Sequence, residues 1–169
     1  MTAIIVIIVI ILLLCFAGVL LIGAPYLPTL DPQVEAAFEL LEPEKYSTML
    51  ELGSGDGKVL IAAAERKIHV TGYEANPILF AIAWLRTRKH RKFVNIIYGN
   101  FWHKRWPETD AIYTFLLPRY MHKLDQKINR YKHRPIKLIS IAFEIPDREP
   151  DHRRNGVFMY IYERRHPSR

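Results

Sequence analysis

Three glycines at alternate positions separate a short apolar run from a helix-forming run early in the chain. They are Gly53, Gly55 and Gly57, and the acidic Glu51 precedes them. Glycine lets a backbone turn with φ > 0 or approach a ligand without a Cβ in the way. A strand that ends in such a turn and leads into a helix presents helix N–H groups to a ligand. The segment therefore predicts an enzyme that binds an adenosine-containing cofactor.

The spacing of these glycines excludes two common phosphate-binding motifs. A dinucleotide fingerprint would need its third glycine at position 58, which is Lys58. The G-x-x-x-x-G-K-[ST] phosphate loop is also absent, because Val59 follows Lys58. About 20 residues after the glycines, the apolar run 69–73 ends in Glu74, where a carboxylate can accept both ribose hydroxyls of an adenosine. The alternative is a tight strand-to-helix turn that binds nothing.

The elements that must position these residues alternate between strands and helices. The expected strands are 49–52, 69–74, 93–98, 111–115, 136–143 and 157–162. The expected helices are 31–42, 57–67, 77–89 and 119–131, the third with Ile78, Ile82 and Leu85 as its buried face. Such alternation implies a parallel sheet with right-handed crossovers. The polar stretch 146–156 is expected to be a loop, which leaves one strand after the fifth.

The N-terminal segment is apolar on every side. No charged residue occurs from Ala3 to Gly23, and a run of about 20 apolar residues matches the thickness of a bilayer. It lacks the basic start of a secretory signal, and a buried core helix is the alternative. All 24 Lys and Arg lie after this segment, which favours keeping the remainder in the cytoplasm, or in the matrix of a mitochondrion. We expect a single-pass anchor at 1–24, a link and helix at 25–45, and one domain at 46–169.

Composition narrows the chemistry and the partners. The single Cys15 lies inside the expected span, so neither a disulfide framework nor a catalytic cysteine is expected, and the seven histidines show no metal-ligand spacing. The formal net charge is +7, and a basic cluster occupies 86–92. That cluster could attract anionic lipid headgroups or be a plain solvated helix end. No nucleic-acid partner is expected, because no basic-aromatic module of that kind occurs.

Two of these motifs carry a resemblance to a known family. Residues 51–58 and 72–77 resemble the first two motifs of class I S-adenosyl-L-methionine-dependent methyltransferases. More closely, the chain resembles membrane-anchored protein-lysine N-methyltransferases, which include the enzymes acting on the c-type subunit of ATP synthase and on the adenine nucleotide translocase. The shared pattern includes 25–29, 115–118 and 143–146. This resemblance implies a Rossmann-like α/β fold with a mostly parallel sheet, trimmed after its fifth strand, behind one transmembrane helix.

The resemblance also implies an activity and a substrate. The expected reaction is S-adenosyl-L-methionine-dependent methylation of a lysine in a membrane-associated protein. The alternatives are methylation of a small or lipid-soluble molecule, and a non-catalytic scaffold tethered to the membrane. A lysine needs little help beyond alignment with the methyl group, because burial beside a cationic sulfonium lowers its pKa. This chemistry therefore does not require a dedicated base, and the sequence leaves open whether the chain has one.

The resemblance assigns roles to residues of this chain. Glu51 is placed near the cofactor's amino-acid portion, Glu74 at the ribose, and Asn100 at the adenine, where relatives usually carry an acid. The cofactor-binding residues it implies are Glu51, Gly53, Ser54, Gly55, Gly57, Glu74, Asn76, Asn100, Phe101, Thr114 and Leu116. Tyr26 and Thr29 are candidates for the mouth through which substrate enters; an interfacial tyrosine and a turn threonine are the alternatives.

Overall fold

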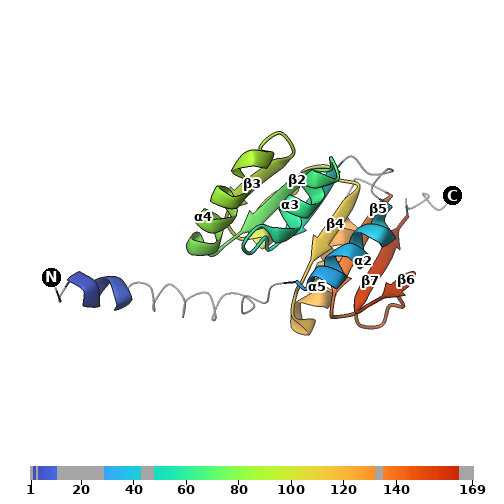
Figure 1. Ribbon diagram of the computed structural model, residues 1–169. Helices are drawn as coiled ribbons and strands as arrows, with labels where there is room; N and C mark the ends of the chain where they lie inside the picture. Colours follow the sequence, from blue (N-terminus) through green and yellow to red (C-terminus); the bar gives the residue numbers. More distant parts are fainter. Residues whose placement is uncertain (1, 3, 11–28, 43–47, 132–134, 164–169) are drawn as a thin grey trace.

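A seven-stranded sheet forms the centre of the molecule in the computed structural model, which describes residues 2, 4–10, 29–42, 48–131 and 135–163 (Figure 1). Its order is β3-β2-β1-β4-β5-β7-β6. The strands are β1 Thr48–Leu52, β2 His69–Glu74, β3 Val94–Tyr98, β4 Ala111–Thr114, β5 Ile136–Ile141, β6 His152–Arg154 and β7 Val157–Tyr162. The first five are parallel, and β7 runs antiparallel to both of its neighbours. The expected mostly parallel sheet is confirmed.

Helices cover both faces of this sheet. They are α2 Asp31–Leu41, α3 Lys58–Glu65, α4 Pro77–Arg86 and α5 Pro118–Arg130, with short 3-10 helices η2 Thr87–His90 and η3 Phe101–His103. Figure 1 shows α2, α3 and α4 in front of the sheet and α5 behind it. Phe38 and Leu60 belong to the core beneath α2 and α3. Met121 and Leu124 belong to the core on the α5 side. The ends of the elements differ from the expected ones by a few residues.

Two strands, β6 and β7, follow the fifth strand in the sheet, so the expectation of a trimmed sheet with one strand there was wrong. Residues 152–154 form β6, and all three side chains are exposed. Such a short polar strand has no apolar face for a hydrophobic pattern to reveal. The turn that follows does carry a signal: Asn155 and Gly156 have φ of 49° and 72°. Asn-Gly is the preferred pair for a two-residue hairpin whose central residues both need φ > 0.

The face that α4 buries is the opposite of the expected one. Ile78, Ile82 and Leu85 are 38%, 39% and 55% exposed, whereas Ala83 is completely buried. A helix that is apolar all round gives no periodic signal for choosing its inner side. The close approach of the glycine-rich turn to α4 decides the matter, because a Cβ at Gly57 would lie 3.1 Å from the Cβ of Ala83. Only a small residue such as Ala83 therefore fits on the side of α4 that faces Gly57.

The expected membrane span lies mostly outside the described residues. Residues 4–10 are helical, and their apolar side chains are about half exposed. Within the ranges that the structure describes, no helix has both the length and the apolar character needed to cross a bilayer. Residues 11–28, which hold the rest of the expected span and Tyr26, are not among the described ones. The anchor therefore stays a prediction.

Candidate cofactor site

The glycine-rich turn lies where β1 ends and α3 begins. Gly53, Gly55 and Gly57 all have positive φ, as predicted, at 92°, 55° and 83°. A Cβ built on Gly53 would meet no atom within 4 Å, so open space faces that position. A ligand therefore has room to approach the backbone of the turn at Gly53. The space beside Gly53 fits the close backbone approach expected for a cofactor.

Glu74 ends β2 and faces this turn. One of its carboxylate oxygens accepts a hydrogen bond from the Gly55 N–H at 2.8 Å, and the other accepts one from the Asn76 N–H at 2.7 Å. Burial raises the pKa of Glu74, and these backbone hydrogen bonds oppose the rise. An ionised carboxylate has about four lone-pair positions, so two remain for ribose hydroxyls. The site keeps the acceptor that the sequence predicts.

Glu51 is the most unusual group in the site. Its side chain is buried, and its Oε2 atom has no hydrogen-bond partner within the described part of the chain. Burial raises the pKa of Glu51 well above its ordinary value; the neighbouring Glu74 adds to the rise, and the Ser54 hydroxyl opposes it. A buried polar atom left unpaired costs about 1–3 kcal/mol. A cationic ligand would remove that cost, and the α-ammonium group of S-adenosylmethionine is such a ligand.

Tyr113 also lies at this site, although no local sequence motif marks it. It is paired with Glu51 across β1 and β4, so both side chains lie on the same face of the sheet. Its buried hydroxyl also has no hydrogen-bond partner among the described residues. Burial raises the pKa of Tyr113, the nearby Thr29 side chain opposes the rise, and Glu51 adds to it. Thr29, expected at the substrate mouth, is thus placed beside the predicted cofactor corner. The register of the two strands was the signal that could have identified Tyr113.

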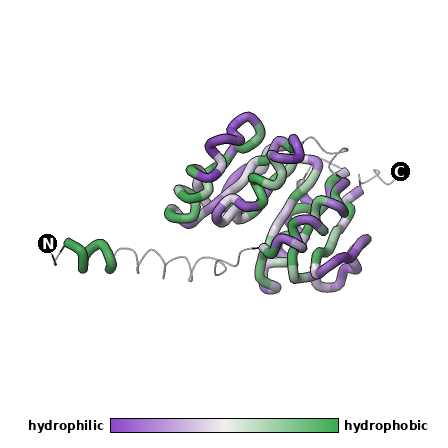
Figure 2. Tube along the Cα trace, in the orientation of Figure 1, coloured by the Kyte–Doolittle hydropathy of each residue, from purple (hydrophilic) through white to green (hydrophobic). Residues whose placement is uncertain are grey.

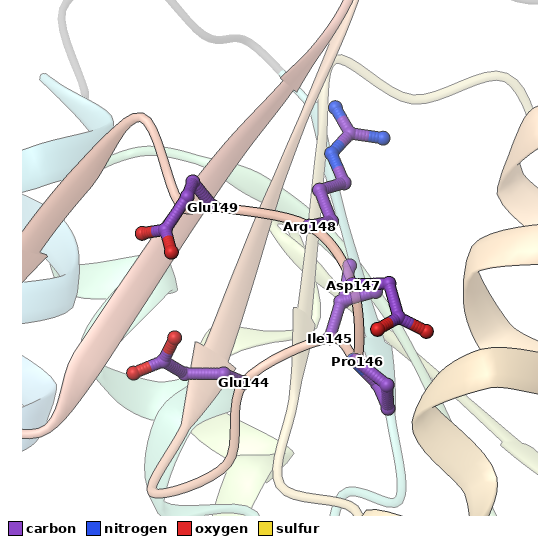
Figure 3. Close-up of a pocket in the computed structure, with 6 residues that line it drawn as sticks. All are labelled: Glu144, Ile145, Pro146, Asp147, Arg148 and Glu149. Atoms are coloured by element: carbon purple, nitrogen blue, oxygen red, sulfur yellow. The ribbon is translucent and has the colours of Figure 1, made fainter.

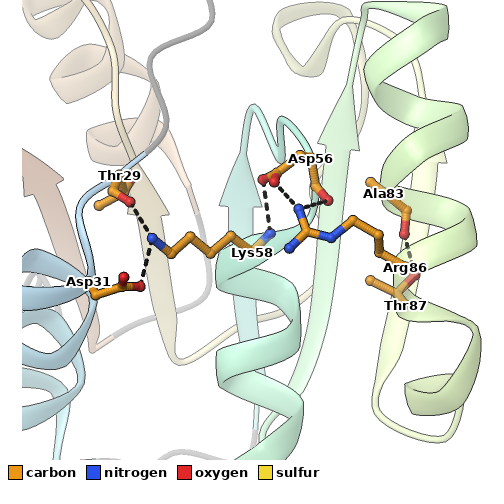
Figure 4. Close-up of polar contacts among 7 residues, drawn as sticks. All are labelled: Thr29, Asp31, Asp56, Lys58, Ala83, Arg86 and Thr87. Atoms are coloured by element: carbon orange, nitrogen blue, oxygen red, sulfur yellow. Dashed lines mark hydrogen bonds and ion pairs between the residues drawn. The ribbon is translucent and has the colours of Figure 1, made fainter.

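Two ion pairs fix the glycine-rich turn on either side (Figure 4). The Lys58 ammonium donates to the Thr29 carbonyl oxygen at 2.8 Å and pairs with Asp31 at 2.7 Å. On the other side, Arg86 of α4 forms an ion pair with Asp56. The Asp56 carboxylate also accepts from the Lys58 N–H at 3.2 Å. The segment that leads into α2 is therefore tied to the cofactor corner.

Two residues that were expected to contact the cofactor, Asn76 and Asn100, cap helices in the structure. The Asn76 side-chain oxygen accepts from the N–H groups of Ile78 and Leu79, at 2.8 and 3.2 Å. The Asn100 side-chain oxygen accepts from the Trp102 N–H at 2.9 Å, where η3 begins. An amide oxygen has a second lone pair, so capping leaves Asn100 able to accept from an adenine amino group.

The remaining expected residues divide between the corner and the core. Ser54 is buried beneath the turn, and its hydroxyl donates to the Tyr73 carbonyl oxygen at 3.5 Å. Thr114 is buried and donates to the Leu52 carbonyl oxygen at 3.4 Å. Leu116 and Phe101 pack in or against the core on the α5 side. The structure thus gathers Glu51, Gly53, Ser54, Gly55, Gly57 and Glu74 at one corner.

A separate hollow lies in the loop after β5 (Figure 3). It is lined by residues 144–149, including the carboxylates of Glu144, Asp147 and Glu149. Arg153 pairs with both glutamates, at 3.2 and 2.5 Å. Arg148 pairs with Asp125 of α5 at 3.3 Å. The arginines thus neutralise much of the acidic charge, and the hollow belongs to the packing of its own loop.

The sheet order, the glycine-rich turn and the acid at the end of β2 define a Rossmann-like class I methyltransferase fold. Solved methyltransferases share it. The RNA methyltransferase of Salinibacter ruber, solved with S-adenosyl-L-homocysteine, superposes with a TM-score of 0.75 over 85% of this chain and 98% of that one, at 23% identity. A methyltransferase of Geobacter sulfurreducens, also solved with S-adenosyl-L-homocysteine, superposes with a TM-score of 0.57 over 72% of this chain and 53% of its own, at 20% identity.

The family follows from the sequence comparison. The ANTKMT methyltransferase domain matches residues 51–152, so the chain belongs to that family. The human ATP synthase C-subunit lysine N-methyltransferase is 29% identical over 76% of this chain and 55% of its own length. The mouse adenine nucleotide translocase lysine N-methyltransferase is 27% identical over 75% of this chain and 56% of its own length. A protein-lysine N-methyltransferase of Saccharolobus islandicus is 27% identical over 72% and 78%. The resemblance is confirmed, although the chain spans little more than half the length of these human and mouse relatives.

Proposed function

We propose that this chain transfers a methyl group from S-adenosyl-L-methionine to a lysine side chain of a membrane-associated protein. The unpaired, buried Oε2 atom of Glu51 beside the glycine-rich turn is the observation that carries the cofactor assignment. Family membership supports the reaction, and the matched relatives are named for lysines of the ATP synthase C-subunit and of the adenine nucleotide translocase.

The residues of the corner divide the work of binding. Glu74 would accept the ribose hydroxyls while it keeps its bonds to the backbone of Gly55 and Asn76. Glu51 would balance the positive charge of the amino-acid portion, and Gly53 leaves room for the ligand. When bound, S-adenosyl-L-methionine supplies an electrophilic methyl group on a cationic sulfur. What the protein must add is alignment, which can contribute about 7–11 kcal/mol.

The substrate lysine must arrive as a neutral amine. Its ordinary pKa of about 10.4 keeps it protonated near neutrality. Burial and a nearby positive charge both lower a lysine pKa, so entry into the site favours loss of the proton. We propose that Thr29 and Tyr26 line the entrance, and the closeness of the Thr29 side chain to Tyr113 supports the assignment of Thr29.

A single-pass anchor at 1–24, with the domain on the cytoplasmic or matrix side, is part of the proposal. The charge-free apolar segment 3–23 supports it. Because α2 begins at Asp31, few residues would separate the anchor from the cofactor corner. The corner would then lie near the bilayer surface, within reach of lysines on membrane proteins.

Methyl transfer to separate classes of acceptor tests this proposal. Membranes from cells that lack the gene would be incubated with the full chain and radiolabelled cofactor, and then divided into protein, lipid and RNA fractions. We expect label in protein, recovered as methyl-lysine after hydrolysis, and much less with a Glu74→Ala variant at a subsaturating cofactor concentration. Label in the lipid fraction would favour the small-molecule alternative, and label in RNA would contradict the lysine assignment. A chain that binds cofactor in titration but labels no fraction would favour the scaffold.

A further inference from the structure

The outer side of α4 is an apolar surface that no described residue covers. Ile78, Ile82 and Leu85 are spaced as i, i+4 and i+7, so they lie along one side of the helix, and all are exposed. We call these three residues the α4 stripe. Trp84, beside it, is 44% exposed. On the opposite side of the helix, Ala83 and Thr87 are buried. The stripe therefore contributes nothing to the core of the domain.

Basic residues continue directly from this stripe. Between Ala75 and Pro107 the chain has seven Lys or Arg and no Asp or Glu. Five of them follow the stripe: Arg86, Arg88, Lys89, Arg91 and Lys92. Arg88 and Lys89 belong to the 3-10 helix η2, which continues directly from α4, and both are exposed. Figure 2 shows the result as a hydrophobic α4 that leads into a hydrophilic turn.

Most of this positive charge is available to an outside partner. Arg86 is held by Asp56, but no ion pair within the described ranges engages Arg88, Lys89, Arg91 or Lys92. The Arg91 guanidinium lies 4.8 Å from the centre of the Trp84 ring. An indole and a cation side by side, next to exposed aliphatic side chains, is a combination that suits a membrane–water interface.

We infer that the α4 stripe and the basic residues 86–92 dock the domain on an anionic lipid surface. The stripe has the aliphatic residues needed to enter the headgroup region, and an exposed patch of this kind marks an interaction site. A run of cations without fixed acidic partners matches a surface of diffuse negative charge, and each basic residue near such a surface strengthens binding about fivefold. Complementary charge alone would equally suit an acidic protein surface, and the exposed aliphatic stripe beside the cations is what favours lipid.

Docking would also orient the cofactor corner. Asn76 caps the first turn of α4 and bonds to Glu74, so the docked helix begins at the corner itself. A domain resting on α4 would hold that corner close to the lipid surface. This orientation concerns the proposed reaction, but the docking does not depend on methyl transfer and can be tested without it.

Fluorescence quenching tests the docking in the full chain. The protein would be reconstituted into vesicles of phosphatidylcholine, with or without phosphatidylserine, whose acyl chains carry bromine. Subtracting the signal of a Trp84→Phe variant isolates Trp84 from Trp102 and Trp106. We expect bromine to quench Trp84 in the vesicles that contain phosphatidylserine, and to quench it at least twofold less in phosphatidylcholine alone.

Two substitutions separate charge and apolar contact from folding. Lys89→Glu and Ile82→Gln should each remove most of the phosphatidylserine-dependent quenching, because both side chains are exposed and face outward. Arg130→Glu, an exposed charge reversal on α5 behind the sheet, should leave it unchanged. Unaltered melting temperatures would show that the variants fold.

Three results would overturn the inference. The first is quenching of Trp84 that is the same with and without phosphatidylserine. The second is an equal reduction of quenching by Lys89→Glu and by Arg130→Glu. The third is a Trp84 that bromine does not quench and whose emission changes with protein concentration. The last would indicate that a second copy of the chain covers the stripe.

Discussion

Replacing Glu51 with glutamine should stabilise the ligand-free protein and weaken its binding of the cofactor. Glutamine has nearly the same shape, so packing around the buried side chain is kept. The substitution removes a carboxylate whose Oε2 atom has no partner among the described residues and which lies close to Glu74. It also removes the negative charge that we propose balances the cofactor. One change therefore moves stability and affinity in opposite directions.

The pH dependence gives the sign and the size of the stability effect. The pKa of Glu51 is raised in the folded protein above its ordinary value of 4.5. Below that value the carboxyl is protonated in both states, and its full contribution to folding is present. As the pH rises further, the unfolded chain releases the proton and the folded protein retains it. The free energy of unfolding then falls by up to about 1.4 kcal/mol per pH unit until the folded pKa is passed.

The Glu51→Gln variant does not lose stability in this way, so the difference in free energy of unfolding between it and the unmodified chain should grow with pH. Glutamine cannot ionise, so over about one to two pH units above the unfolded pKa the variant gains about 1–3 kcal/mol relative to the unmodified chain, which corresponds to roughly 2–12 °C in melting temperature for a chain of this size. Glu74, whose pKa is raised as well, remains and gives a weaker slope of the same sign. Loss of a charge-assisted contact of about 1.5–3 kcal/mol should lower the affinity for S-adenosylhomocysteine roughly 10- to 150-fold.

Thermal melts from about pH 4 to about pH 8 measure the first effect, because the slope appears between the unfolded and the folded pKa. Calorimetric titration measures the second. Glu65→Gln is the matched control, because Glu65 is exposed on α3. It should leave both quantities near those of the unmodified chain. The reasoning is refuted if Glu51→Gln lowers the melting temperature at the alkaline end of this range, or if it stabilises the protein without any loss of affinity.

Three further substitutions test the architecture of the corner. Gly72→Ala would place a Cβ 2.2 Å from the Ser54 hydroxyl oxygen, so it should cost about 1–3 kcal/mol in chemical denaturation and weaken cofactor binding; unchanged values would mean that the turn adapts freely. Lys58→Met should slow methyl transfer with a stability loss below about 1 kcal/mol, because Asp31, its partner in the ion pair, is largely exposed. Arg66→Met, which breaks a similar exposed ion pair on the same helix, should leave transfer unchanged, and equal effects would contradict the role of Lys58. Tyr113→Phe should leave the melting temperature equal or higher, because the hydroxyl lost has no described partner, while it raises the KM for substrate; a clear destabilisation would show that the hydroxyl is bonded.

The cofactor corner could be predicted from the sequence because its information is local. Gly53, Gly55 and Gly57 have the positive φ that their spacing implies, and Glu74 ends β2 as expected. Each of these features depends on a few consecutive residues. The parallel sheet was predictable for a related reason, since alternating strands and helices leave few other arrangements.

What the sequence did not reveal depends on contacts between distant segments. Tyr113 becomes part of the site only through the register of β1 and β4. The inner face of α4 is chosen by the packing of Ala83 against Gly57, and a helix that is apolar all round hides that choice. The strand β6 carries no apolar pattern, although the Asn155-Gly156 pair after it could have indicated a hairpin.

Calorimetric titration of S-adenosylhomocysteine into the full chain tests the central claim most directly. We expect saturable binding, and binding at least about tenfold weaker after Glu74→Ala, the equivalent of about 1.4 kcal/mol. Absence of binding to the unmodified chain, or the same affinity in both proteins, would contradict the claim that Glu51, Glu74 and the glycine-rich turn form a cofactor site.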